Sequence, residues 1–246
     1  MAKSEIVIDT GEGKAKATLV LPETAGVPMP GVILYMDAFG RRPVLDQMAE
    51  RIAGEGYAVL VPDLLYRFGD YGPFDPSTAF SVEDTRNQLK GMIGGTPLAY
   101  TERDTIAFMA ALASAGAVGP LATVGYCMGG ARALTAAAAY PERIVAAASF
   151  HGGNLASDLP DSPHLRAGDI EARVYVGTAG VDGSFPPEQS TRLVEAFRNA
   201  EVDFVLENYI GMAHGWAVAD HSVYNAAGSE RHWQRLLTLL AETLRV

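Results

Sequence analysis

The chain has 246 residues, of which 48% are hydrophobic and 20% charged, which is typical of a globular protein. Its formal net charge of −10 argues against nucleic acid as a partner, because phosphate binding requires a basic face. There is no apolar run long enough to cross a bilayer, no signal-peptide pattern and only one cysteine, so we expect a cytoplasmic protein without a membrane partner.

The predicted elements begin with a β-hairpin. Residues 5–9 and 15–21 flank the turn sequence Gly11-Glu12-Gly13. Short and nearly continuous apolar runs follow, as expected for strands that are covered on both faces in a parallel sheet. These runs are residues 32–36, 57–61, 121–124, 144–150, 172–176 and 204–206.

Longer segments with helical periodicity separate the apolar runs. Three sets of apolar residues at helical spacing predict core-facing helices. They are Val44, Leu45, Met48 and Ile52; Ile106, Met109, Leu112 and Ala113; and Trp233, Leu236, Leu237, Leu240 and Leu244. The alternation predicts an α/β fold with a mostly parallel, doubly wound sheet after the N-terminal hairpin, in a single domain over residues 1–246.

Residues 66–97 interrupt this alternation. The segment is rich in glycine, proline and aromatic residues and has no obvious strand. It is either an ordered excursion that borders a pocket or a long surface loop.

The only cysteine lies in Gly125-Tyr126-Cys127-Met128-Gly129-Gly130, between a predicted strand and a predicted helix. This pattern is typical of a nucleophile elbow, with a thiol in the place of the usual serine. A lone cysteine is more often an inert buried hydrophobe, but the six-residue context favours a nucleophile. The turn also directs the amide of Met128 toward a position where an oxyanion could be held.

Polar residues follow the other predicted strands, where ligands bind in open α/β sheets. They are Asp37, Asp63, His151, Asp182 and His214. The chain order Cys127, Asp182, His214 is that of nucleophile, acid and base in α/β-hydrolases. The rival acids Asp169 and Asp203 lie at the wrong ends of strands, and Asp63 is better explained as a loop-stabilising residue. His164, His221 and His232 are interpreted as surface or packing residues, and no cluster has the spacing of a metal site.

Several segments resemble the dienelactone hydrolase family along nearly the full length. They are residues 35–40, 53–67, 125–130 and 224–233, of which the cysteine elbow is the most specific. The resemblance implies an α/β-hydrolase fold, a triad of Cys127, Asp182 and His214, and an oxyanion hole formed by the amides of Met128 and Ala38. It further implies hydrolysis of an enol-lactone to a dicarboxylic acid in aromatic catabolism, without a cofactor.

Two positions depart from the family pattern. Asp37 stands where the family commonly has a glutamate that activates the thiol, so we expect Asp37 in that role. Val218 stands where well-known members have an arginine that binds the substrate carboxylate. Arg67 or Arg86 could correspond to a second binding arginine. Candidates for the pocket wall are Phe39, Tyr66, Tyr71, His151 and Trp216, and His151 is equally well explained as an oriented loop histidine.

The sequence therefore predicts a thiol hydrolase of a lactone or a small activated ester. One alternative keeps the elbow and broadens the substrate to general carboxylic esters or thioesters. Another alternative is a hydrolase-like protein that only binds a ligand or senses oxidants through Cys127. The oligomeric state is left open.

Overall fold

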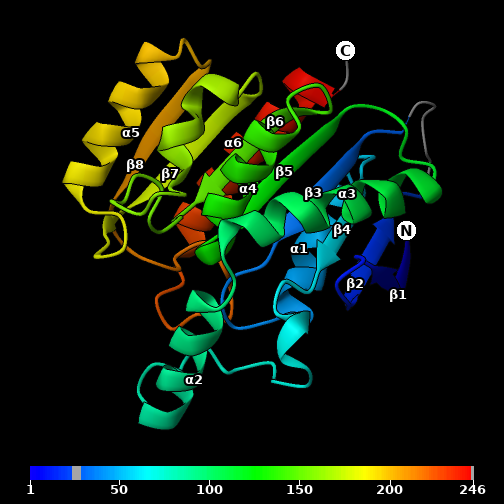
Figure 1. Cartoon of the computed structure of the whole chain (residues 1–246), viewed down its shortest axis with the longest axis horizontal. Coiled ribbons are helices and arrows are strands. Elements are labelled where there is room, and N and C mark those ends of the chain that lie inside the picture. The colour runs from blue at the N-terminus through cyan, green and yellow to red at the C-terminus, as the bar shows by residue number, and fades with distance from the viewer. Residues whose placement is uncertain (24–28, 245–246) are drawn as a thin grey trace.

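A computed structural model describes residues 1–23 and 29–244. Within these residues, eight strands form one sheet in the order β1-β2-β4-β3-β5-β6-β7-β8 (Figure 1). The strands are β1 (Ala2–Asp9), β2 (Lys14–Leu21), β3 (Gly31–Tyr35), β4 (Ala58–Pro62), β5 (Leu121–Tyr126), β6 (Ile144–Phe150), β7 (Arg173–Val181) and β8 (Phe204–Ala213). The hairpin of β1 and β2 is antiparallel, as is the pair of β2 and β4, and the remaining pairs are parallel. The predicted mostly parallel sheet is thus confirmed.

Burial of the strands follows the continuous apolar runs of the sequence. Every residue of β3, β4 and β5 is buried, which explains why these strands lack the alternation of a one-sided sheet. At the sheet margin, β7 and β8 extend beyond their predicted runs and pair as far as Val181 and Ala213. The extensions carry exposed residues, so an apolar run did not reveal them.

Helices cover both faces of the sheet. They are α1 (Pro43–Ala53), α2 (Glu83–Gly94), α3 (Leu98–Ser114), α4 (Met128–Ala139), α5 (Pro187–Asn199) and α6 (Ala226–Leu244), with the short 3-10 helices η1 (Tyr66–Phe68) and η2 (Pro163–Asp169). Figure 1 shows α3 and α4 in front of the sheet and α6 behind it. On that rear face α1 meets α6, where the Arg51 guanidinium lies 4.6 Å from the Trp233 ring centroid and pairs with Glu230 at 2.8 Å.

The predicted helical stripes are core-facing with one exception. Val44, Leu45, Met48 and Ile52 are buried on α1. Ile106 of α3 is 59% exposed, whereas Met109 and Leu112 of the same stripe are buried. The prediction for Ile106 was wrong because α3 buries the side of Thr101, Asp104 and Thr105, so its core-facing stripe includes polar residues. No helix in the two described ranges is long and apolar enough to cross a membrane.

Residues 66–97 form an ordered excursion that contains η1 and α2. The helix α2 buries only Leu89 and Met92, which explains why its sequence carries little helical periodicity. In Figure 1, α2 projects from the lower edge of the molecule, near the loop that follows β8. The excursion therefore stands at the edge where the parallel strands end.

Candidate active site

The site is built on the register between β3 and β5. Tyr35 pairs with Gly125 in this parallel pair of strands. Asp37 and Ala38 follow the end of β3, and Cys127 and Met128 follow the end of β5. The loop after β3 and the turn after β5 are therefore neighbours at the carboxyl edge of the sheet, where such folds bind ligands.

Cys127 occupies a strained turn between β5 and α4. Its φ of 53° lies in the left-handed region that non-glycine residues rarely adopt. The neighbouring glycines permit this turn, because a Cβ atom on Gly125 would lie 1.9 Å from the Gly129 carbonyl oxygen, and one on Gly129 would lie 2.3 Å from the Tyr35 carbonyl oxygen. The close passage of β3, β5 and α4 is the geometry expected of a nucleophile elbow.

His214 and Asp182 meet beyond the ends of β8 and β7. His214 Nδ1 lies 2.7 Å from Asp182 Oδ2, and the Cys127 side chain acts on the same imidazole as a hydrogen-bonding group. The bond to Asp182 fixes Nδ1 as the donor, which leaves Nε2 for the thiol. The structure thus brings together the three residues that the sequence placed in the order nucleophile, acid, base.

Ser184 is a member of the site that the sequence reasoning missed. Its hydroxyl donates to Asp182 Oδ1 at 2.6 Å, its amide donates to the same oxygen at 2.8 Å, and its Oγ lies 3.1 Å from His214 Nδ1. An Asp followed two residues later by a Ser is a common turn pattern, so the sequence offered only a weak signal.

The electrostatics of the pair favour an ionised carboxylate and a protonated imidazole. Burial alone would raise the pKa of Asp182, but the bonds from His214 and Ser184 outweigh burial and hold it below its usual value. Burial alone would lower the pKa of His214, but Cys127 and Asp182 raise it to about 10. The arrangement therefore stabilises an imidazolium beside the thiol.

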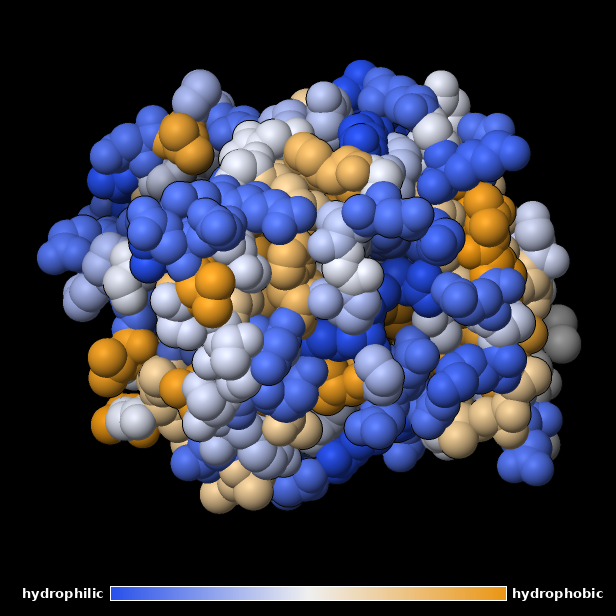
Figure 2. All heavy atoms as spheres, turned by 90° about the horizontal axis from the view of Figure 1, so that it is seen from below, coloured by the Kyte–Doolittle hydropathy of each residue, from blue (hydrophilic) through white to orange (hydrophobic). Residues whose placement is uncertain are grey.

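A cavity of about 920 Å³ opens at Cys127 and His214. Its walls come from the loop after β3, from α2 and the segments around it, from the first turns of α4, and from the loops after β6, β7 and β8. Phe80, Lys90 and Ile93 contribute from the 66–97 excursion, so that segment borders the site. Figure 2, seen from the lower side of Figure 1, shows hydrophobic side chains as separate spots among hydrophilic ones on this face.

Asp37 is bonded to a cation and a histidine instead of the thiol. Arg42 donates to both of its carboxylate oxygens, at 2.6 and 2.8 Å, and His221 Nε2 lies 3.1 Å from Oδ2. Burial alone would raise the pKa of Asp37, yet His221 and Arg42 lower it. Within the described residues Cys127 is not among the side-chain partners of Asp37. The predicted role of Asp37 in activating the thiol stays a prediction without a direct contact.

Arg42 and His221 extend this network across the site. Arg42 also binds Asp220 through Nε at 2.6 Å, which links the loop after β3 to the loop after β8. His221 was interpreted from sequence as a surface or packing residue, but it lines the cavity and contacts Phe39 edge-on. The packing role is confirmed, whereas the place of His221 in the cavity wall was not predicted, because a loop carries no periodicity from which to read the direction of a side chain.

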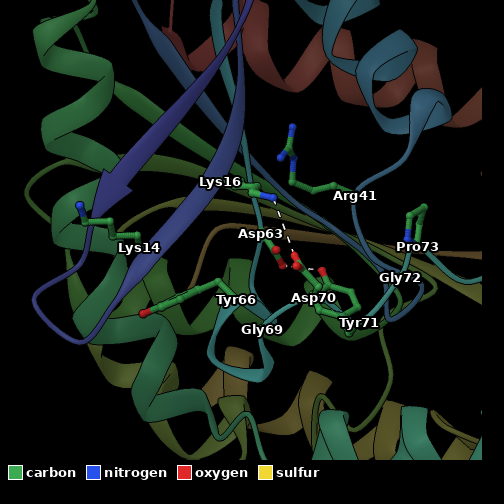
Figure 3. A pocket seen from close by; sticks show the side chains of 10 residues that line it. All are labelled: Lys14, Lys16, Arg41, Asp63, Tyr66, Gly69, Asp70, Tyr71, Gly72 and Pro73. Carbon is green, nitrogen blue, oxygen red and sulfur yellow. Dashed lines mark hydrogen bonds and ion pairs between the residues drawn. The ribbon is translucent and has the colours of Figure 1, made fainter.

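Of the five predicted pocket-wall residues, the structure places only Phe39 in this cavity. Tyr66 and Tyr71 line a separate cavity of about 240 Å³, next to Lys16 and Arg41 (Figure 3). There the Tyr71 hydroxyl donates to Asp63 at 2.5 Å, and the Tyr66 hydroxyl bonds Thr10 and Asp104. The prediction for the two tyrosines was wrong because the loop turns toward β2 and away from the elbow.

His151 and Trp216 do not line this cavity, and their prediction as pocket wall was also wrong. Both are fully buried, and the His151 ring lies 5.1 Å from the His214 ring and 5.0 Å from the Trp216 ring. Burial holds the pKa of His151 well below its usual value, so this imidazole is neutral. His151 therefore packs edge-on against His214, and Trp216 packs edge-on against His151.

Two further positions, Val218 and Arg67, were compared with arginines that bind the substrate in the family. Val218 is completely buried, and Arg67 pairs with Asp104 at 2.7 Å and with Glu12 at 2.8 Å outside the cavity. Neither position therefore presents a cation to the site. Among residues 1–23 and 29–244, no group of three or more His, Cys, Asp or Glu side chains is arranged to hold a metal ion.

Comparisons with known proteins agree with this geometry. The model of the dienelactone hydrolase family matches residues 15–244. A protein of Escherichia coli O157:H7, provisionally named a carboxymethylenebutenolidase, is 28% identical over 221 residues, which are 88% of this chain and 78% of the relative. A carboxymethylenebutenolidase of Rhodococcus opacus is 23% identical over 218 residues, which are 87% of this chain and 82% of the relative.

Solved structures share the fold over the whole chain. The crystal structure of a provisionally named dienelactone hydrolase from Klebsiella pneumoniae subsp. pneumoniae matches with a TM-score of 0.86 and 24% identity, covering 98% of both chains. That of a dienelactone hydrolase-like promiscuous phosphotriesterase from metagenomic libraries matches with a TM-score of 0.81 and 24% identity, covering 99% of this chain and 98% of the other. The predicted α/β-hydrolase fold is thereby confirmed.

Proposed function

Because this chain belongs to the dienelactone hydrolase family, we propose that it hydrolyses a lactone or a small carboxylic ester through an acyl-enzyme on Cys127. The observation that carries the proposal is the chain of contacts from Asp182 to His214 to Cys127 at the wall of one cavity. A nucleophile, a base and a group that orients the base are the minimum set for covalent acyl transfer. No cofactor or metal enters this mechanism.

The first half of the reaction forms the acyl-enzyme. The Cys127 thiolate attacks the acyl carbon, and the carbonyl oxygen becomes an oxyanion. The amides of Met128 and Ala38 are the proposed donors to that oxygen, since both residues follow the ends of the paired strands β3 and β5 and Met128 begins α4. His214 then gives its Nε2 proton to the leaving oxygen as the carbon–oxygen bond breaks.

The second half releases the acid. His214, now neutral, takes a proton from water as that water attacks the thioester carbon. The carbon–sulfur bond breaks, the carboxylic acid leaves, and the thiolate is restored beside the imidazolium. Asp182, which Ser184 holds by two hydrogen bonds, keeps the ring oriented through both halves.

Mass spectrometry of the protein after brief exposure to a panel of lactones and aryl esters tests the proposal. We expect a mass increase equal to the acyl group on the peptide that contains Cys127. The Cys127→Ala variant should carry no adduct and lose at least about 1,000-fold in kcat. The His214→Gln variant is the companion, because it keeps the thiol and should acylate and deacylate slowly. Full ester turnover by Cys127→Ala would overturn the mechanism.

A second candidate function is a broad carboxylesterase or thioesterase. The cavity of about 920 Å³ favours it, because this volume is in the range that holds drug-sized ligands and is large for a small lactone. Comparing kcat/KM for a dienelactone with kcat/KM for a short aryl ester and a thioester separates the two functions. A narrow lactonase should prefer the dienelactone by orders of magnitude.

A further inference from the structure

The loop that follows β3 is shaped by the carboxylate of Asp37. Its Oδ1 accepts a hydrogen bond from the Phe39 amide at 3.1 Å, and its two oxygens bind the Arg42 guanidinium at 2.6 and 2.8 Å. The same guanidinium donates through Nη1 to the Gly40 carbonyl oxygen at 3.1 Å. The loop is therefore cross-linked on both sides of Ala38, which lies between Asp37 and Phe39 in the chain.

The amide of Ala38 is available to a ligand. Among the residues that the structure describes, neither this amide nor the amide of Met128 donates a turn or loop hydrogen bond. Ala38 is only 1% exposed, so its backbone is largely shielded from water. An unpaired amide in such a place is costly, and fixed donors of this kind hold the oxyanion in acyl-transfer enzymes. The bonds around Ala38 thus hold one of the two proposed oxyanion donors in place.

Arg42 connects this loop to the segment that carries the proposed base. Its Nε and Nη2 bind both carboxylate oxygens of Asp220, at 2.6 and 2.9 Å, and its Nη2 lies 3.3 Å from His221 Nε2. Asp220 and His221 belong to the loop that follows β8, and His214 begins the same loop. A single arginine side chain, 5% exposed, therefore joins the loop of an oxyanion donor to the loop of the base.

The hydrogen bonds of Asp37 use its whole carboxylate. Oδ1 accepts from the Phe39 amide and from Arg42 Nη1, while Oδ2 accepts from Arg42 Nη2 and lies 3.1 Å from His221 Nε2. An ionised carboxylate has about four lone-pair sites, so these four nitrogen atoms occupy it fully. No site is left for a bond to the Cys127 thiol.

We propose that Asp37 and Arg42 are positioning residues that hold the Ala38 amide as an oxyanion donor, and that Asp37 does not activate the thiol. The inference rests on the proposed function, since it assigns a role to residues of the same site. The pair acts through the Ala38 amide and, by way of Asp220, through the loop of His214. A rigid donor stabilises the oxyanion, which forms only as the reaction proceeds, and contributes little to binding of the ester.

Two reagents distinguish the oxyanion donors from the thiol, and neither requires turnover. The Cys127 thiolate adds to the carbonyl carbon of phenethyl trifluoromethyl ketone, so that a carbon–sulfur bond forms, the carbonyl electron pair moves to oxygen and no group leaves. Iodoacetamide alkylates the same thiolate with loss of iodide and forms no oxyanion. The Kd of the ketone, measured by protection of Cys127 against alkylation, reports the oxyanion donors. The alkylation rate as a function of pH reports the thiol.

Arg42→Lys tests the positioning role, because lysine keeps the charge but cannot bind two carboxylates and a loop carbonyl at once. We expect the Kd of the ketone to rise and kcat for an aryl ester to fall, each about 10- to 100-fold, with KM changing less than about threefold. The alkylation rate should also stay within about threefold of the wild-type rate. Arg67→Lys is the matched control, since Arg67 also binds a buried carboxylate but lies outside the cavity. It should leave all four quantities unchanged.

Asp37→Asn tests the rival role of the carboxylate, because the amide keeps the size of the side chain and removes its charge. We expect the pH of half-maximal alkylation to move by less than about one unit, and a larger shift, as expected for the loss of a thiol-activating group, overturns the proposal. An unchanged Kd of the ketone in Arg42→Lys also overturns it. If Arg42→Lys does not fold, Asp220→Asn replaces it, because the Asp220 side chain is 34% exposed. There kcat should fall about 3- to 10-fold, and an unchanged kcat overturns the proposal.

The same measurements separate this inference from the hydrolytic proposal. If the wild-type protein hydrolyses no ester but binds the ketone, and Arg42→Lys binds it more weakly, the positioning role stands and the hydrolase proposal fails. If esters are hydrolysed and Arg42→Lys changes neither the Kd of the ketone nor kcat, the positioning role fails alone. A wild-type protein that does not bind the ketone also overturns the positioning role.

Discussion

The orientation of Asp182 and His214 depends on Ser184, a side chain that belongs to no recognised motif. It donates two hydrogen bonds to one oxygen of Asp182, while the other oxygen of that carboxylate accepts a hydrogen bond from His214. Ser184 therefore fixes the carboxylate that orients the proposed base. Its influence reaches the reacting atoms only through Asp182 and His214, so it is a positioning residue.

Replacing Ser184 by alanine removes the hydroxyl bond and leaves the amide bond in place. We expect kcat to fall about 3- to 10-fold with little change in KM, since a lost hydrogen bond of about 1 kcal/mol loosens the base and leaves the other lining residues of the cavity in place. Steady-state kinetics on an aryl ester measures this split. Ser222→Ala, in another cavity residue, is the matched control. A rise in KM with unchanged kcat would show that Ser184 contacts substrate instead.

The pH dependence of stability follows from His214. Its pKa of about 10 in the folded protein lies above the usual 6.5, so the folded state binds this proton more tightly than the unfolded state. The contribution is fully present below about pH 6.5 and is lost as the pH rises toward 10. By urea unfolding, the wild type should exceed His214→Gln by roughly 1.5–3 kcal/mol at pH 6, with the difference shrinking by pH 10. A difference that grows with pH would contradict the assignment.

Sequence reasoning located side chains at strand ends better than it predicted their directions. Cys127, Asp182 and His214 follow three apolar runs, and the order of such runs could be read directly. Whether a loop side chain lines the cavity, as His221 does, or is fully buried, as His151 is, depends on contacts between distant segments. The hydrogen bond from Arg42 to Asp37 could not be predicted either, because no sequence pattern indicates that these two side chains meet.

At the scale of elements, strands covered on both faces were predictable and the excursion was not. The buried strands β3, β4 and β5 appear in the sequence as continuous apolar runs because water reaches neither side of them. The helix α2 buries only two residues and contributes mainly to the cavity wall. Its sequence is therefore constrained by the cavity more than by packing in a core. Hydrophobic periodicity therefore does not predict a helix with so few buried residues.

The packing of α4 against β3 yields a sharp contrast between two glycines. Gly129→Ala would place a Cβ 2.3 Å from the Tyr35 carbonyl oxygen, a backbone atom that cannot step aside, so we expect a loss of about 2–4 kcal/mol in stability together with activity. Gly91→Ala on α2 meets nothing within 4 Å and should stabilise by about 0.5–1 kcal/mol. Thermal unfolding of both variants measures these changes in stability. An unchanged stability of Gly129→Ala would contradict the close approach of α4 to β3.

At the scale of the whole molecule, the site is assembled from segments that are far apart in the chain. Arg42 reaches Asp220 across 178 residues, and Tyr126 reaches His232 across 106. These contacts join the first half of the sheet to the loop and helix that follow β8. The mostly parallel order of the strands makes such distances unavoidable, because each crossover requires a helix. The proposed nucleophile therefore acquires its base only when the last strand has docked.

The position of β8 at one margin of the sheet affects how the protein loses its activity under stress. No described strand pairs with its outer side, and most of its residues are at least partly exposed, yet His214 follows directly at its end. Marginal strands detach in small fluctuations that leave the central layers intact. Detachment of β8 would carry the imidazole away while Cys127 stays on the protected middle strand β5. We therefore expect inactivation and denaturation to be separate events, with the proposed activity lost under milder stress than the stress that unfolds the central strands.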